Sequence, residues 1–65
     1  MKIIVNNEEV VFDGATVAEL LAHLGVSAEG IAVAAGTKIV PAAAWGDHLL
    51  SQNDNITIIR ATQGG

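Results

Sequence analysis

Two short runs rich in β-branched residues open the sequence, at residues 2–6 (KIIVN) and 9–12 (EVVF). Such runs predict strands, and the asparagines between them tolerate the left-handed backbone of a tight hairpin turn. Side chains alternate between the two faces of a strand, so each run divides into two sets. We expect Ile3, Val5, Val10 and Phe12 on one face of a sheet, and Ile4 and Val11 on the other.

The segment TVAELLAHLG, residues 16–25, carries both a start signal and a stop signal for a helix. Thr16 and Glu19 have the capping-box spacing, in which the hydroxyl accepts a hydrogen bond from a first-turn amide and the carboxylate reaches back to the cap. Gly25 stands where a left-handed C-cap is expected. The apolar residues follow the spacing of one helical stripe, which predicts that Val17, Leu20, Leu21 and Leu24 face the core.

The second half of the sequence predicts another hairpin and a final strand. Residues 31–35 (IAVAA) and 38–40 (KIV) indicate two strands around a Gly36-Thr37 turn, which suits type II′ geometry with glycine first. Residues 51–55 form a turn cluster in which Asp54 fixes the start of the last strand, residues 56–61. Between them, residues 42–50 predict a short helical turn that carries Trp45, Leu49 and Leu50 inward.

This order of elements predicts an α+β fold, with a mixed sheet of about five strands and one main helix packed on one face. The sequence shows no internal repeat and no linker, so we expect one domain over residues 1–65. Glycine holds no shape by itself. We therefore expect residues 62–65 (TQGG) to form a flexible C-terminal tail after the last strand.

Composition narrows the function classes. The formal net charge is −4 and Lys2, Lys38 and Arg60 are the only basic side chains besides histidine, which argues against nucleic acid as a partner. The sequence contains no cysteine, no signal-peptide pattern and no apolar stretch of membrane-spanning length, so we expect a cytoplasmic protein that does not enter a membrane.

No catalytic or metal-binding constellation is evident among the polar residues. His23 and His48 lack neighbouring residues at ligand spacing, so we expect no metal site. We also expect no catalytic nucleophile with a general base beside it, as an enzyme would need. The chemical group that remains is the carboxylate of Gly65, which follows Gly64 at the end of the sequence. Taken alone, two terminal glycines are most often a frayed end.

The motifs, taken together and in order, resemble the β-grasp (ubiquitin-like) sulfur carriers, and most closely the ThiS family of thiamine biosynthesis. The resemblance runs along the whole sequence. It departs modestly at Asn7 and Asn53, where the family more often has glycine, and at Gly36-Thr37, where it more often has Asn-Gly. It rests on an IxV strand ending in Asn6, GATVAELLAHLG, AVA, IVP at residues 39–41, Trp45, Asp54 and the closing RATQGG.

The resemblance implies a covalently modified carrier that is not itself an enzyme. In the family an E1-like adenylyltransferase uses ATP to adenylate the C-terminal glycine, which becomes a thiocarboxylate with sulfur mobilised from cysteine by a cysteine desulfurase or similar enzyme. The thiocarboxylate then donates its sulfur to thiazole synthase. On this sequence the modified residue is Gly65, and Gly64 gives a backbone thin enough to pass into the partner's site. The free carrier is expected to be a monomer with no bound cofactor.

The alternation of side chains between the two faces of a strand also predicts a docking surface. Ile56 and Ile58 should face the helix, which turns Ile59 outward on the side of Ile4 and Val11. Large aliphatic side chains on the helix-free face often mark a contact with a partner protein, here the adenylating enzyme and thiazole synthase. The alternative is that these three side chains are scattered surface apolar residues without a role.

Two other function classes stay open on the sequence. The small subunit of molybdopterin synthase is also a β-grasp protein that ends in Gly-Gly, although that family tends to be longer and its tail does not resemble RATQGG. A non-covalent ubiquitin-like binding module would use its sheet to bind partners and make no use of its C-terminus. Intact mass after sulfur loading separates carriers from such modules.

Overall fold

The computed structural model describes residues 1–60 of the chain. It contains five strands, one α-helix and one short 3₁₀ helix. In chain order these are β1 (Lys2–Val5), β2 (Glu8–Val11), α1 (Val17–Leu24), β3 (Ile31–Ala35), β4 (Lys38–Val40), η1 (Ala42–Ala44) and β5 (Asn55–Arg60).

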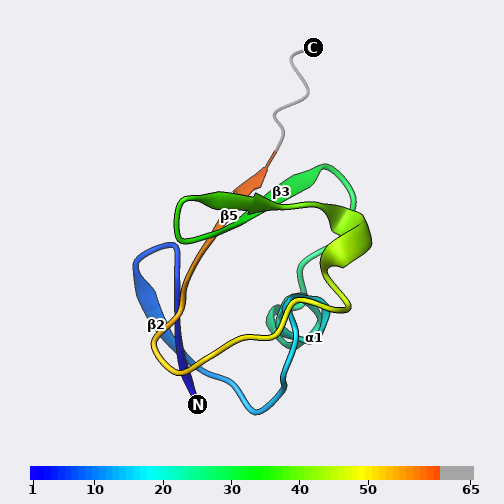
Figure 1. Cartoon of the computed structure of the whole chain (residues 1–65). Coiled ribbons are helices and arrows are strands. Elements are labelled where there is room, and N and C mark those ends of the chain that lie inside the picture. Colours follow the sequence, from blue (N-terminus) through cyan, green and yellow to red (C-terminus); the bar gives the residue numbers. More distant parts are fainter. Residues whose placement is uncertain (61–65) are drawn as a thin grey trace.

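The five strands form one mixed sheet in the order β2-β1-β5-β3-β4. The central strands β1 and β5 are parallel, whereas the β1–β2 and β3–β4 hairpins and the β3–β5 pair are antiparallel. The sheet curves around α1, which lies against one of its faces (Figure 1). The predicted α+β class, with a mixed sheet and one main helix, is confirmed.

Both hairpin turns follow from their residues. Asn6 and Asn7 have φ angles of 49° and 69°, the two left-handed positions that a type I′ turn requires. In the second hairpin only Gly36 has a positive φ, of 60°, as a type II′ turn demands. Asparagine and glycine adopt these angles more readily than other residues, so both turns are encoded locally.

Helix α1 begins and ends where its capping residues predict. The Thr16 hydroxyl accepts a hydrogen bond of 3.2 Å from the Glu19 amide, and Glu19 Oε1 accepts one of 3.1 Å from the Thr16 amide. The same oxygen accepts a bond of 3.0 Å from the Ala15 amide. At the other end Gly25 adopts φ 70° in the left-handed region. The predicted capping box and C-cap are confirmed.

The core lies between α1 and the concave face of the sheet. The alternation of side chains along the strands correctly assigned Ile3, Val5 and Phe12 to this face, where they are buried. Val10 lies on the same face and is half-buried. From the helix, Val17, Leu20 and Leu21 are buried and Leu24 is half-buried. The side chains that are fully enclosed are Ile3, Val17, Leu20, Val33 and Ile56.

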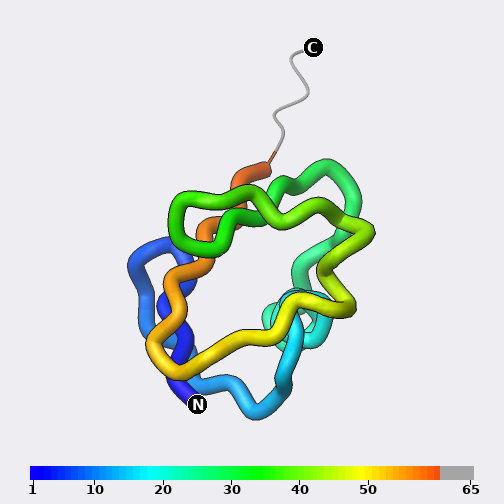
Figure 2. Tube along the Cα trace, in the orientation of Figure 1, coloured from blue at the N-terminus to red at the C-terminus, as the bar shows by residue number. Residues whose placement is uncertain are grey.

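The segment between β4 and β5 closes the helix side of the core by passing next to the start of α1 (Figure 2). The amide of Ala18 donates to the carbonyl of Trp45 at 3.0 Å, and the amide of Leu50 donates to the carbonyl of Ala15 at 2.7 Å. Trp45 and Leu50 are buried, as predicted.

Leu49 differs from its neighbours in this segment. The prediction that it points inward is wrong, because its side chain is 70% exposed. Leu49 pairs with Thr16 in an isolated antiparallel bridge, so the backbone here is extended and not helical. Consecutive side chains of an extended backbone point to opposite sides. Leu50 takes the core side and Leu49 therefore takes the solvent side.

Candidate functional site

The candidate site is the end of β5, because this strand leads toward the predicted acceptor. β5 ends at Arg60, on the side of the molecule opposite to Met1 (Figure 1). The final strand was expected to extend to Ala61. That residue and the expected tail at residues 62–65, with Gly64 and Gly65, lie outside the described residues. The described part of the chain defines the base from which they continue.

β5 is held along most of its length by one neighbour, and by the backbone of the other only near its start. On one side it pairs with β3 in five successive positions, from Ile56 opposite Ala35 to Arg60 opposite Ile31. On the other side β1 is shorter: its last backbone bond to β5 runs from the Asn6 amide to the Ile56 carbonyl, at 3.0 Å. The end of β5 therefore extends past the end of β1.

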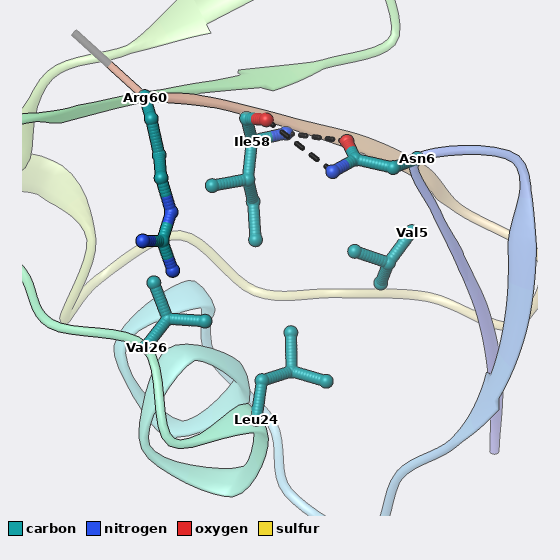
Figure 3. Close-up of a pocket in the computed structure, with 6 residues that line it drawn as sticks. All are labelled: Val5, Asn6, Leu24, Val26, Ile58 and Arg60. Carbon is teal, nitrogen blue, oxygen red and sulfur yellow. Dashed lines mark hydrogen bonds between the residues drawn. The ribbon is translucent and has the colours of Figure 1, made fainter. Parts of the chain in front are cut away.

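The Asn6 side chain continues the contact where the β1 backbone stops. Its Oδ1 accepts a hydrogen bond of 2.8 Å from the Ile58 amide, and its Nδ2 donates one of 3.3 Å to the Ile58 carbonyl (Figure 3). The sequence pattern indicates Asn6 only as a turn residue and the end of a strand motif. The contact joins residues 52 positions apart in the chain, and no local pattern signals it.

A cleft of about 440 Å³ lies beside this contact, on the helix side of the sheet. The Arg60 side chain lines this cleft and extends toward Val26 in the loop after α1 (Figure 3). Among residues 1–60 the one ion pair joins Lys2 to Glu9, so no described carboxylate pairs with Arg60. The cleft thus combines apolar walls with one cation and one amide, from Val5, Asn6, Leu24, Val26, Ile58 and Arg60.

The three residues predicted to dock a partner all lie on the helix-free face of the sheet. Ile59 is 52% exposed, Val11 is 81% exposed and Ile4 is half-buried. This arrangement confirms the predicted assignment of these side chains to one face of the sheet. Docking itself stays a prediction, because exposure alone does not identify a partner contact.

The strand register separates Val11 from Ile59. Val11 pairs with Lys2, two residues before Ile4, and Ile4 pairs with Asn55, four residues before Ile59. Two plus four residues at about 3.3 Å each place Val11 about 20 Å from Ile59 along the strand direction. Ile4 lies between them. The structure therefore brings Ile4 and Ile59 to neighbouring strands but leaves Val11 at the far end of the face.

A residue that sequence analysis missed lies closer to Ile59. Ile39 on β4 is 64% exposed and pairs with Ala34, which pairs in turn with Thr57. The next row along the same face holds Ile59 opposite Ala32. Alternation along residues 38–40 was a signal that could have found Ile39. We name the exposed apolar residues of these rows, Ala32, Ile39 and Ile59, the outer apolar patch.

The described residues offer little other chemistry. Within residues 1–60 no group of three or more His, Asp or Glu side chains is placed to hold a metal ion. The His23 ring packs edge-on against Phe12, with centroids 5.5 Å apart. Hydrogen bonds from the Ala15 and Thr16 amides lower the pKa of Glu19, which serves the helix cap. In the described part of the chain no helix has the length and apolar character needed to cross a membrane.

Comparison with known proteins gives a consistent family assignment. The ThiS family model matches residues 2–65. A crystal structure of a thiamine biosynthesis protein (ThiS) from Geobacter metallireducens superposes with a TM-score of 0.84 at 28% identity, over 100% of both chains. An NMR structure of a thiamine biosynthesis protein from the same organism gives a TM-score of 0.77 at 26% identity, over 100% of this chain and 88% of that chain. No curated protein gives a significant match.

These comparisons confirm the resemblance that the motifs predicted, and the β-grasp fold with it. The match covers both the strand motifs and the helix from which the resemblance was first inferred. The chain belongs to the ThiS family.

Proposed function

We propose that this chain is the sulfur carrier of thiamine biosynthesis and that it carries sulfur as a thiocarboxylate on Gly65. The observation that supports this most strongly is the family match, which spans residues 2–65 and so includes the Gly64-Gly65 pair. Both structural relatives are thiamine biosynthesis proteins by name. In this role the chain is a co-substrate that other enzymes modify and use.

The chemistry requires that a poor electrophile be activated. A carboxylate repels nucleophiles and has no good leaving group, so in the proposed first step a carboxylate oxygen of Gly65 attacks the α-phosphate of ATP and displaces pyrophosphate. The outer sulfur of the desulfurase persulfide then attacks the acyl carbon and AMP leaves. A thiol reductant next attacks the desulfurase sulfur of the resulting acyl disulfide, which releases the thiocarboxylate and leaves a disulfide on the desulfurase. The partner must supply the positive charge and the positioning for the phosphate chemistry.

Three partners follow from this proposal. An E1-like adenylyltransferase binds ATP and activates Gly65, a cysteine desulfurase or similar enzyme mobilises the sulfur, and thiazole synthase receives it. We propose that the first and last of these dock on the helix-free face, with Ile59 at the centre and Ile4 at the margin of the contact. The outer apolar patch supports this choice, because the exposed residues Ala32 and Ile39 add apolar surface near Ile59. Val11 lies too far along the face to share that centre.

The proposal is tested by the intact mass of the protein after loading. The purified chain is incubated with ATP, cysteine, a thiol reductant, the E1-like adenylyltransferase and a cysteine desulfurase. We expect a mass increase equal to the replacement of one oxygen by sulfur, located at Gly65 by fragmentation. Deletion of Gly65, or one added residue after it, should abolish the increase. A Gly65-deleted variant that gains the same mass would refute the proposal, and an unmodified wild-type chain would favour a non-covalent module.

A further inference from the structure

The Asn6 side chain takes the place of a peptide group in the parallel ladder between β1 and β5. The backbone ladder runs from the Ile4 amide to the Asp54 carbonyl and from the Asn6 amide to the Ile56 carbonyl. Its next rung would bond the Ile58 amide and carbonyl to the β1 chain. At Asn6, however, the backbone turns into the hairpin with φ 49°. The side-chain amide meets both Ile58 groups instead, with its oxygen as acceptor and its nitrogen as donor.

The Asn6 side-chain amide lies at the last point where β1 supports β5. Beyond Ile58 the described strand has two more residues, Ile59 and Arg60, which pair with Ala32 and Ile31 of β3. Without the Asn6 side-chain amide, the support that β1 gives to β5 would end at Ile56. The final part of the strand would then depend on a single neighbour, which makes strand ends fray more readily.

We propose that Asn6 is a positioning residue for the acceptor: by holding Ile58 in the sheet, it fixes the point and direction in which the chain leaves β5. The inference rests on the proposed function of Gly65. Five residues from Arg60 to Gly65 span at most about 18 Å, so the point at which β5 ends sets the region of the partner that the acceptor can reach. Activation requires the carboxylate within bonding distance of a phosphate, so a partner that binds a displaced strand end must also restore its native position, which weakens binding.

The two asparagines of the hairpin offer a matched pair of variants. Both have positive φ, so glycine at either position keeps the turn, but only Asn6→Gly removes the amide that bonds Ile58. Asn7→Gly controls for the added chain freedom. Asn6→Asp is a conservative third variant, because it tolerates the same φ and keeps the acceptor for the Ile58 amide while losing the donor to the Ile58 carbonyl.

The measurement is the steady-state rate at which the E1-like adenylyltransferase activates the full chain with ATP. We expect kcat/KM for Asn6→Gly to fall about fivefold to tenfold below that of Asn7→Gly. The loss should appear in KM, since the saturating partner restores the strand direction, and Asn6→Asp should lie between wild type and Asn6→Gly. Amide exchange at Ile58 should rise about tenfold in Asn6→Gly, with exchange at Val33 unchanged.

Other results would overturn the inference. If the two glycine variants have kcat/KM values within about twofold of each other, Asn6 acts only in the turn. The same conclusion follows if Asn6→Asp behaves as wild type while Asn6→Gly and Asn7→Gly lose activity equally. Failure of the proposed function is distinguishable, because the wild-type chain itself would then gain no adenylate or sulfur.

Discussion

The indole Nε1 of Trp45 donates a hydrogen bond of 2.8 Å to the backbone carbonyl of Val40. The bond is buried and ties the segment after η1 to the end of β4. Replacement of Trp45 by phenylalanine removes the donor and part of the buried ring. Loss of a partner from a buried acceptor costs about 1–3 kcal/mol, so we expect Trp45→Phe to lower the free energy of unfolding by that amount. Chemical denaturation followed by circular dichroism measures it.

Leu49→Ala is the matched control for this change, because Leu49 lies in the same segment but is 70% exposed. Exposed substitutions of this kind usually alter stability by less than about 0.5 kcal/mol. Equal losses in the two variants would contradict the assignment of Trp45 to the core and Leu49 to the surface.

Gly14 and Phe12 approach each other so closely that glycine is required by space alone. A Cβ on Gly14 would lie 2.3 Å from Cζ of Phe12 and 3.1 Å from Cβ of Glu19, and the φ of Gly14 is not in the left-handed region. We expect Gly14→Ala to destabilise the fold by about 1–3 kcal/mol through overpacking. At Gly46 an added Cβ meets nothing within 4 Å, so Gly46→Ala should change stability little.

A double-mutant cycle tests the cause of the Gly14 effect. Phe12→Leu removes the ring atom that the new Cβ would strike, so Gly14→Ala should cost less in that background than in the wild type. Additive losses in the double variant would show that some other contact makes glycine necessary.

The capping box gives the chain a contribution to stability that depends on pH. Hydrogen bonds from the Ala15 and Thr16 amides hold the pKa of Glu19 below its ordinary value of 4.5. A carboxylate whose pKa is lowered in the folded state stabilises the fold above its unfolded pKa. That contribution disappears as the pH falls through the folded pKa.

Glu19→Gln isolates this contribution, because glutamine keeps an acceptor oxygen but does not titrate. We expect the wild type to be the more stable protein at neutral pH and the difference to shrink below about pH 5. Urea unfolding at a series of pH values measures the two curves. Parallel curves throughout the acidic range would contradict a stabilising role of the ionised carboxylate.

The outer apolar patch yields a prediction about partner binding. An aspartate at Ile59 or Ile39 would place an unpaired charge in the centre of the proposed contact. We expect each substitution to reduce kcat/KM for adenylation at least about tenfold. Val11→Asp is the comparison, since Val11 is exposed on the same face about 20 Å away along the strands, and should cost less than about twofold. Equal losses at Val11 and Ile59 would show that the contact covers the whole face.

Local signals predicted much of the fold. The helix bounds follow from the capping pair Thr16 and Glu19 and from Gly25, each of which acts on backbone groups within a few residues. The strand faces follow from alternation, which needs no knowledge of neighbouring strands. For this reason alternation alone correctly assigns Ile3 to the core and Ile59 to the surface.

The remaining features depend on contacts between distant segments. Alternation assigned Val11 and Ile59 to one face, but only the pairing of β1 with β5 sets the distance between them. Leu49 points outward because an isolated bridge to Thr16 extends the backbone there, against the helical expectation. The Asn6 contact with Ile58 likewise exists only once the parallel pair has formed. Register and topology, and not local preference, decided these three cases.

The position of β5 also has a consequence for how the protein is made. β5 is the central strand of the sheet, yet it comes last in the described part of the chain. During translation both hairpins and α1 are synthesised before the strand that joins them. The inner edges of β1 and β3 remain unpaired in that interval, and such edges invite pairing with other chains. The native sheet therefore forms only once β5 has been synthesised and can pair with both β1 and β3.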